Sequence, residues 1–354
     1  MEYEERDKNG NYRTKKRKTV ISSAEFSYNK LESKIIVYAL KNGDSYTSKM
    51  MNLEVELSAL LDKPLYEKID RPGLCEYHFM TISPNRKIVC ASKGLERNAS
   101  SQIDLGYGVK YDPSKIPHIL VAGGTGSGKS VFIEFLITEF LKIGNIDDDI
   151  PSVYICDPKN SDLSQLSQYF GADYVSSSLN GIAKICRLVV EEMNNRYEYM
   201  HDNFSYGSSY VDHGLLPVWL IFDELGAFQA NGTDKQSKTV ISEVMDYIKQ
   251  IILKGRQAGV FCLLASQQMS SNTLNTELRD NLGLRIALGV NSQEGYRMVF
   301  GGATPIPQPI EAKGAGYLYM HGSGKEVAQY YEAPWIDRDK YDFIKEILKY
   351  TSAS

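Results

Sequence analysis

Hydrophobic and polar positions along this chain follow a pattern that predicts a large sheet covered by helices. From about residue 116 to residue 334, short continuous apolar runs alternate with longer segments of helical periodicity. Continuous apolar runs are typical of parallel strands buried on both faces, so the alternation predicts an α/β domain with a mostly parallel sheet. The expected strands are 119–122, 153–156, 218–222, 260–265, 285–290 and 317–320.

The segments on either side of this domain have different patterns. Residues 1–18 are polar and charged, which predicts a disordered tail. Residues 19–115 predict a small α+β unit, because a strand-like run is followed by leucines at helical spacing and by two further short strands. These elements are expected at 35–40, 50–61, 77–82 and 87–91. Residues 335–354 predict a C-terminal amphipathic helix and tail.

Composition narrows the class of protein. The 354 residues are 42 % hydrophobic and 24 % charged, which is ordinary for a globular protein. No apolar run is long enough to span a membrane and the cysteines show no C-x-x-C pair, so we expect a cytoplasmic protein, with recruitment to a membrane or to DNA left open. The net charge of −4 argues against coating nucleic acid by bulk charge. The basic run at 13–18 is interpreted as a solvated tail, with contact to DNA or anionic lipid as the alternative.

The segment after the first strand of the large domain matches a phosphate-binding loop. Residues 123–130 fit G-x-x-x-x-G-K-[ST] between an apolar run and a helical stretch. In such a loop, backbone N–H groups at the N-terminus of a helix surround and bind the phosphate oxygens. We expect Lys129 to reach the β- and γ-phosphates of ATP and Ser130 to ligate Mg²⁺. The expected nucleotide-binding residues are Gly123, Gly124, Thr125, Gly126, Ser127, Gly128, Lys129, Ser130 and Val131.

A second nucleotide signal ends another expected strand. The apolar run 218–222 leads into Asp223 and Glu224. Beside a phosphate loop, Asp223 would hold Mg²⁺ and Glu224 would orient and polarise the attacking water. Gln267 ends the next apolar strand, where its amide could sense the γ-phosphate. The tripeptide 157–159 (Asp-Pro-Lys) ends a further strand at the edge where parallel sheets bind ligands, and spacing alone assigns it no chemical step.

Together these motifs resemble the FtsK/SpoIIIE family of DNA-pumping motor ATPases. The resemblance runs through about 116–334 and reaches back to the helix near residues 51–61, which is similar to part of the α-subdomain of that family. The segments that carry it are 117–123, 157–159, 192–197, 223–225, 254–259, 265–267, 284–288 and 314–319.

The resemblance implies a RecA-like P-loop core that assembles into a homohexameric ring around double-stranded DNA, with ATP sites between subunits. It implies a cis site made of Lys129, Ser130, Asp223, Glu224 and Gln267. An arginine from the neighbouring subunit is also implied, because a guanidinium commonly stabilises transferred phosphoryl charge. Arg285 is the first candidate, with Arg279, Arg256 and Arg297 as the others. The polar segments 270–275 and 201–216 are the candidate DNA-contacting loops.

Membrane spans and a C-terminal winged-helix domain, which chromosome-segregating members of the family carry, are not found in this sequence. We therefore expect a motor that serves a plasmid, conjugative element or phage, with a relaxase or replication protein as partner. Two alternatives remain: a motor for protein secretion, and a nucleotide-switched adaptor that recruits such a partner. Glu224 argues against the adaptor, because a pure switch does not need a carboxylate that activates water.

Overall fold

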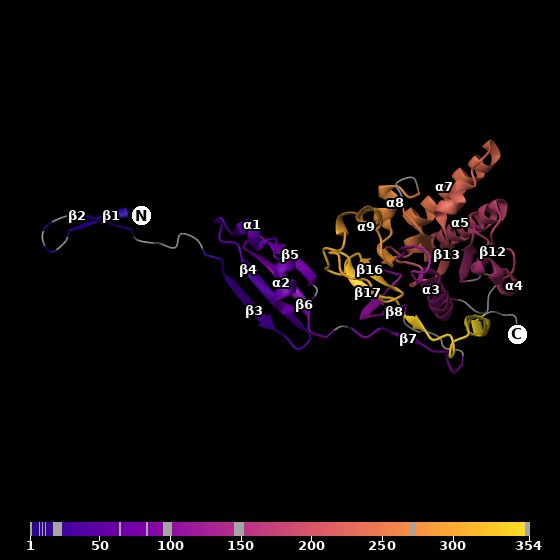
Figure 1. Ribbon diagram of the computed structural model, residues 1–354. Helices are drawn as coiled ribbons and strands as arrows, with labels where there is room; N and C mark the ends of the chain where they lie inside the picture. Colours follow the sequence, from indigo (N-terminus) through magenta and orange to yellow (C-terminus); the bar gives the residue numbers. More distant parts are fainter. Residues whose placement is uncertain are drawn as a thin grey trace. The chain divides into compact units, whose positions relative to one another are not determined.

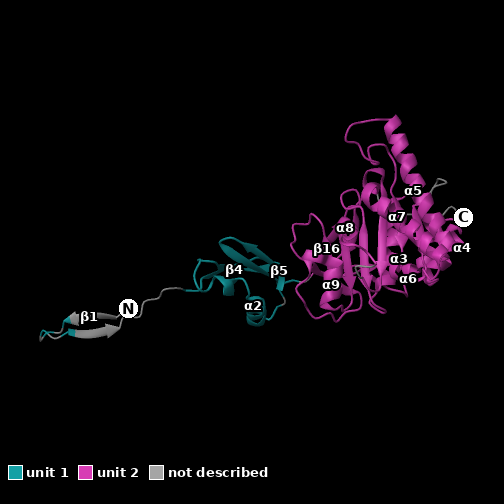
Figure 2. Ribbon diagram, turned by 90° about the horizontal axis from the view of Figure 1, so that it is seen from above, with its two compact units in different colours: residues 1–83 teal, residues 84–354 magenta. Residues whose placement is uncertain are grey.

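The computed structural model divides the chain into two compact units, residues 1–83 and residues 84–354 (Figures 1 and 2). It describes residues 2–6, 8, 10, 12–16, 23–63, 65–82, 84–94, 101–144, 152–269 and 273–350. Within these residues, no helix combines the length and the apolar character that a membrane crossing requires.

Unit 1 is built on a four-stranded antiparallel sheet in the order β3-β4-β6-β5. Its elements are β3 (Phe26–Lys30), β4 (Lys34–Leu40), α1 (Thr47–Met50), α2 (Glu54–Leu61), β5 (Leu65–Arg71) and β6 (Leu74–Met80). The buried Tyr77 fixes the helices to the sheet: its hydroxyl donates to Met50 O at 2.7 Å and accepts from Leu53 N at 3.1 Å. The expected strand at 35–40 lies in β4, the one expected at 77–82 overlaps β6 but extends past its end at Met80, and the expected helix is split into α1 and α2.

The N-terminal segment differs from the disordered tail that its polarity predicts. β1 (Glu2–Arg6) and β2 (Tyr12–Lys16) pair as an antiparallel ribbon. Gly10 has a φ of 86°, which lets the backbone reverse between the strands. The Arg6 guanidinium lies 5.4 Å from the centroid of the Tyr12 ring, a cation–π contact across the ribbon. Composition alone could not predict this pairing, because it depends on register.

Unit 2 is built on an eight-stranded sheet in the order β12-β11-β13-β14-β10-β15-β16-β17. Its strands are β10 (Ile119–Gly123), β11 (Val153–Cys156), β12 (Val175–Ser176), β13 (Val218–Phe222), β14 (Val260–Ser266), β15 (Leu284–Leu288), β16 (Ala315–Met320) and β17 (Gln329–Glu332). The strands from β12 to β15 in this order are parallel, and β16 and β17 are antiparallel to their neighbours. The predicted α/β class with a mostly parallel sheet is therefore confirmed.

Helices cover both faces of this sheet. The helices and 3₁₀ turns are α3 (Lys129–Ile143), η1 (Asp162–Leu166), α4 (Ser167–Phe170), α5 (Leu179–Asp202), α6 (Leu225–Ala230), α7 (Lys235–Ala258), α8 (Thr276–Asn281), α9 (Gln293–Phe300) and η2 (Gly301–Ala303). Ile119 and Val121 of β10 belong to the apolar core that α3 covers, whereas Leu120 and Ala122 belong to the core under α5, α7 and α9. Burial on both faces explains why this strand is a continuous apolar run.

Residues 84–115 belong to unit 2, although their sequence pattern groups them with the small unit. β7 (Ile88–Val89) pairs with β18 (Trp335–Ile336), and β8 (Ile103–Gly106) pairs with β9 (Val109–Tyr111). The Tyr331 hydroxyl donates to Leu105 O at 2.7 Å, which ties β8 to β17. β8 and β9 are close in the sequence, but the partners of β7 and of Leu105 are more than 200 residues away, with a separation of 226 for the Tyr331 bond, so local pattern does not reveal them.

The C-terminal segment packs into the same core. It forms α10 (Phe343–Ile347) and η3 (Leu348–Tyr350). The Tyr341 hydroxyl and Thr138 Oγ1 of α3 lie 2.7 Å apart, and Ile347 is fully buried. This segment therefore supports α3, the helix that follows the phosphate-binding loop.

Gly255 generates a prediction about the packing of α7 on β14. A Cβ added to Gly255 would lie 2.0 Å from the backbone oxygen of Val260, so one of the two elements would have to move. We expect Gly255→Ala to lower the free energy of unfolding by about 1–3 kcal/mol in denaturant titrations. Gly302→Ala is the matched control, because nothing lies within 4 Å of its added Cβ. Equal stability of the two variants would contradict this packing.

Candidate nucleotide-binding site

The loop between β10 and α3 has the backbone conformation that a phosphate-binding loop requires. Gly126 and Gly128 have φ values of 81° and 99°, which side chains other than glycine rarely adopt. A Cβ on Gly128 would also lie 3.0 Å from the Cα of Gly314. Ser127 closes the turn, because its N–H donates to Gly124 O at 3.1 Å and its carbonyl accepts from Gly314 N at 3.0 Å. A hydrogen bond thus joins the loop to the segment around Gly314.

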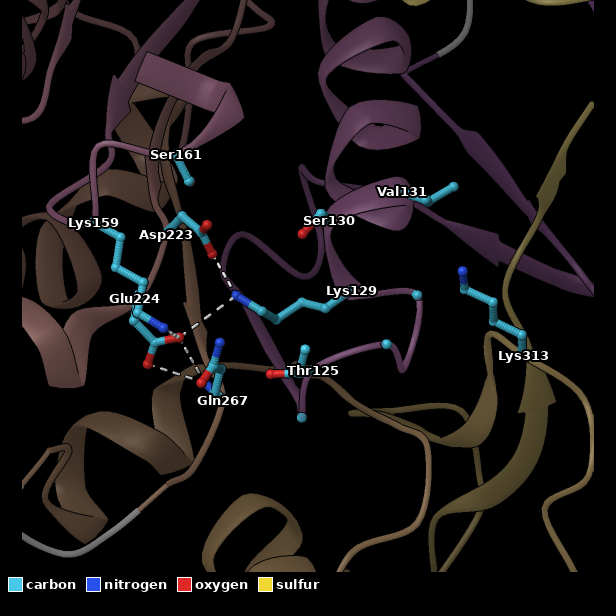
Figure 3. Close-up of a pocket in the computed structure, with 13 residues that line it drawn as sticks. Thr125, Lys129, Ser130, Val131, Lys159, Ser161, Asp223, Glu224, Gln267 and Lys313 are labelled. Atoms are coloured by element: carbon cyan, nitrogen blue, oxygen red, sulfur yellow. Dashed lines mark hydrogen bonds and ion pairs between the residues drawn. The ribbon is translucent and has the colours of Figure 1, made fainter. Parts of the chain in front are cut away.

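A pocket of about 270 Å³ lies at this loop (Figure 3). It is lined by Gly124, Thr125, Gly126, Gly128, Lys129, Ser130, Val131, Lys159, Ser161, Asp223, Glu224, Gln267 and Lys313. The structure thus brings Lys129, Ser130, Asp223, Glu224 and Gln267 together, as the sequence predicts. Gly123 and Ser127 support the loop from outside this lining: a Cβ on Gly123 would lie 2.5 Å from Ser127 Oγ.

Lys129 joins the loop to the carboxylates at the end of β13. Its Nζ lies 2.5 Å from Asp223 Oδ1 and 3.8 Å from Glu224 Oε2. All three side chains are buried, with at most 8 % of each exposed. Asp223 is itself fixed by its backbone N–H, which donates to Cys156 O on β11 at 2.9 Å. The two nucleotide signals of the sequence are therefore in direct contact.

Glu224 is held in a strained conformation by several hydrogen bonds. Its φ of 65° lies in the left-handed region, where non-glycine residues are uncommon and cluster at functional sites. Its carboxylate accepts from the Ser266 hydroxyl at 2.9 Å, from the Gln267 peptide N–H at 3.0 Å and from Lys159 Nζ at 3.1 Å. Burial raises the pKa of Glu224, but these hydrogen bonds and the Lys129 charge outweigh it, so its pKa lies below the ordinary glutamate value.

Asp157 organises the segment that brings Lys159 and Ser161 to the pocket. It is fully buried at the end of β11, and its Oδ2 accepts from Ser161 N at 2.7 Å, Ser161 Oγ at 2.8 Å and Ser164 N at 3.0 Å. The Asp-Pro-Lys motif at a strand end was the only sequence signal for this segment. Nothing in the sequence pointed to Ser161, or to Lys313, which approaches from a distant turn.

The residues present fit Mg²⁺ bound together with a phosphate chain. Among the residues that the structure describes, no group of three or more His, Cys, Asp or Glu side chains could hold a metal ion alone. Ser130 and Asp223 line the pocket with oxygen donors, which Mg²⁺ prefers, and Mg²⁺ usually completes its shell with water and substrate phosphates.

Arg285 is turned into its own unit, which disfavours it as an arginine that reaches a neighbouring subunit, although that role stays a prediction. Only 6 % of Arg285 is exposed. Its guanidinium donates to Leu282 O at 2.8 Å and Phe300 O at 3.1 Å, and it pairs with Asp280 Oδ1 at 3.5 Å. These partners occupy the guanidinium within its own unit, an arrangement that the sequence spacing could not reveal.

The other arginine candidates differ in exposure. Arg279 pairs with Asp280 at 3.1 Å and is 15 % exposed, and the exposed Arg256 donates from Nε to Ser114 O at 3.2 Å. Arg297 lies exposed on α9.

The two candidate DNA-contacting segments lie at different edges of the sheet. Segment 201–216 follows α5 and precedes β13, so it lies at the amino ends of the parallel strands. Residues 270–272 of the other segment, 270–275, lie outside the described residues. β14, which precedes it in the sequence, ends at the sheet edge that carries the nucleotide pocket.

The fold and this pocket define a P-loop nucleotide-binding domain of the RecA-like type. The model of the FtsK/SpoIIIE family matches residues 95–294, more than half of the 354 residues, and the chain belongs to that family.

Individual relatives agree with this assignment. The chain is 34 % identical over 241 residues to the Ftsk domain-containing protein YdcQ of Bacillus subtilis, covering 68 % of this chain and 47 % of that one. It is 26 % identical over 337 residues to the DNA translocase FtsK of Staphylococcus aureus (strain Mu50), covering 87 % and 40 %. The chain therefore spans about half or less of the length of these relatives.

Solved structures share the fold. The pCW3 conjugation coupling protein TcpA, a monomer with ATPγS, matches with a TM-score of 0.61 at 16 % identity, over 92 % of this chain and 93 % of that one. ATPases 2 and 3 of EssC from Geobacillus thermodenitrificans match with a TM-score of 0.56 at 16 % identity, over 76 % and 50 %.

The ion pair between Lys159 and Glu224 generates a prediction about pH. Because the pKa of Glu224 is lowered in the folded protein, its stabilisation is present above the ordinary glutamate pKa and is lost as the pH falls through the lowered pKa. We expect Lys159→Met to lower the free energy of unfolding at neutral pH, and the difference from the parent protein to shrink toward acid pH. Denaturant titrations across this pH range measure it.

Lys184→Met is the matched control, because Lys184 pairs with Asp173 at a site where both side chains are well exposed. In a Glu224→Gln background the effect of Lys159→Met should largely vanish. A loss that is the same at every pH would show that the Lys159 stem, and not its charge, stabilises the fold.

Proposed function

We propose that this chain is an ATP hydrolase that moves double-stranded DNA as a ring of six subunits. The observation that carries the proposal is the convergence of Lys129, Asp223 and Glu224 in one buried cluster beside an open phosphate-binding loop. This arrangement supplies a cation for phosphate oxygens, a metal ligand and a carboxylate for the attacking water in a single pocket.

Each residue has a distinct role in this proposal. The backbone N–H groups of the loop cradle the α- and β-phosphates, and Lys129 neutralises the β- and γ-phosphates. Ser130 and Asp223 hold Mg²⁺, which neutralises charge on the phosphate chain. Glu224, kept ionised by its hydrogen bonds, accepts a proton from the attacking water. Gln267 adds a polar contact at the γ-phosphate end, because it follows the strand next to β10.

The cargo is proposed from family membership and from the names of the relatives. Several matched proteins are named DNA translocases, and the structural neighbour TcpA is named a conjugation coupling protein. These names favour DNA over protein as cargo, and they support a role in the transfer or maintenance of a mobile element with a relaxase or replication protein as partner. Segment 270–275 is the better candidate for DNA contact, because the described residues next to it end β14 at the same sheet edge as the nucleotide pocket.

A protein-secretion motor is the second candidate. Structural neighbours include EssC and the Type VII Secretion ATPase EccC of Thermomonospora curvata, which matches with a TM-score of 0.51 at 19 % identity. Identities of 16–19 % support only a shared fold, for these neighbours as for TcpA, so DNA remains the favoured cargo because the sequence relatives are named DNA translocases. In either case we propose that an arginine from the neighbouring subunit stabilises the phosphoryl charge, with the exposed Arg297 and Arg256 preferred over Arg285.

Two variants separate nucleotide binding from hydrolysis. We expect Lys129→Ala to weaken ATP binding strongly and to abolish turnover, because the phosphates lose their central cation. Glu224→Gln should retain ATP binding and lose turnover by about 10²–10⁴-fold, because the amide cannot accept the proton. Equilibrium binding and steady-state phosphate release measure the two effects. Hydrolysis by Glu224→Gln at the parent rate would refute the role of Glu224.

Stimulation of hydrolysis distinguishes the cargoes. We expect ATPase activity to rise with linear double-stranded DNA and to increase with its length before it saturates. Single-stranded DNA and an unrelated protein are the controls. DNA affinity should fall steeply with salt, with a log–log slope near −0.9 for each phosphate contacted. No response to any nucleic acid would move the proposal to a protein cargo.

A further inference from the structure

Lys313 lines the pocket from the side opposite the carboxylates. Asp223, Glu224 and Gln267 follow β13 and β14, which lie on one side of β10 in the sheet. Lys313 precedes β16, which lies on the other side of β10, beyond β15. In Figure 3, Lys313 and Val131 lie at one end of the pocket, Glu224 lies toward the other end, and Lys129 lies between them. Since Lys159 pairs with Glu224 at that other end, the pocket has a lysine at each end, with Lys129 between them.

The turn that carries Lys313 is fixed to the phosphate-binding loop. The backbone closes from Ala315 N to Ala312 O at 3.0 Å, and Gly314 has a φ of 82°. The N–H of Gly314 donates to Ser127 O at 3.0 Å. A Cβ added to Gly128 would lie 3.0 Å from the Cα of Gly314, so the two backbones are in close contact. The base of the Lys313 side chain is thus anchored beside the loop.

Lys313 differs from the other lysines of the pocket in how its charge is compensated. Lys129 contacts Asp223 and Glu224, and Lys159 contacts Glu224. Lys313 is exposed, and within the described part of the chain no carboxylate lies in ion-pair distance of its ammonium. An exposed lysine at the wall of an anion-binding pocket is available to a ligand, and an ammonium acts as a point charge toward phosphate.

We propose that Lys313 binds the α-phosphate of the nucleotide, and the inference rests on the proposed function of this pocket as an ATP site. Glu224 faces the γ-phosphate, because water attacks there, so the nucleoside end of the phosphate chain points away from Glu224. That direction leads along the loop to Val131 and Lys313. Lys129 serves the β- and γ-phosphates, and Lys313 adds affinity that ATP and ADP share.

Equilibrium titrations with ATP and with ADP, both with Mg²⁺, test the proposal. We expect Lys313→Ala to raise the Kd for ATP and for ADP by the same factor, about three- to tenfold, which is the effect of a charge-assisted contact at a partly exposed site. Lys313→Arg should retain most of the affinity, because it keeps the charge. Lys249→Ala is the control, since Lys249 is an exposed lysine of α7 that does not line the pocket.

Two results would overturn the role of Lys313: an unchanged Kd for both nucleotides, or a loss confined to ATP, which would place the lysine at the γ-phosphate. Failure of the ATP site itself has a different signature. In that case the parent protein binds neither nucleotide, or Lys129→Ala binds both as the parent does. Because Lys313 is exposed, circular dichroism of Lys313→Ala should match the parent and so separate lost binding from lost folding.

Discussion

The buried contact between Lys129 and Asp223 is the interaction on which the site depends. Lys129 is the first residue of α3, and Asp223 directly follows β13, which is separated from β10 by β14. A buried ammonium without a partner would cost several kcal/mol, so each charge requires the other. Because the strands are parallel, their carboxyl ends meet at one edge, and the pair can form only when β13, β14 and β10 are in this order.

Close backbone approaches pack the phosphate-binding loop against neighbouring segments. Gly128 and Gly314 approach each other where a side chain would collide, and Gly316 pairs with Leu288 where a Cβ would lie 2.0 Å from Ala287 O. Three segments far apart in the sequence therefore pack closely beside one another at the loop. The left-handed backbone of Glu224 persists for a related reason, since hydrogen bonds from β14 and from Lys159 hold its carboxylate in place.

Local pattern was sufficient for the inner strands of the large sheet and for the loop, whereas the two edge strands, β12 and β17, were not predicted. The expected runs 119–122, 153–156 and 218–222 lie within β10, β11 and β13, because strands buried on both faces must be continuously apolar. β3 could not be predicted, because all five of its residues are exposed and its sequence has no apolar run. Lys313 could not be predicted, because its turn is bonded to the distant Ser127. The burial of Arg285 could not be predicted either, because it depends on how the chain folds back to place Asp280, Leu282 and Phe300 around the guanidinium.

The ion pair also explains why nucleotide and metal would bind together under the proposed function. Lys129 would exchange a carboxylate for phosphate oxygens, and Asp223 would exchange an ammonium for hydrated Mg²⁺. Each buried charge then keeps an opposite charge beside it throughout. A nucleotide without metal would take Lys129 and leave Asp223 buried without a counterion, apart from weaker compensation by more distant lysines. The pocket therefore favours the magnesium complex through the energetics of burial, before any ligand geometry is considered.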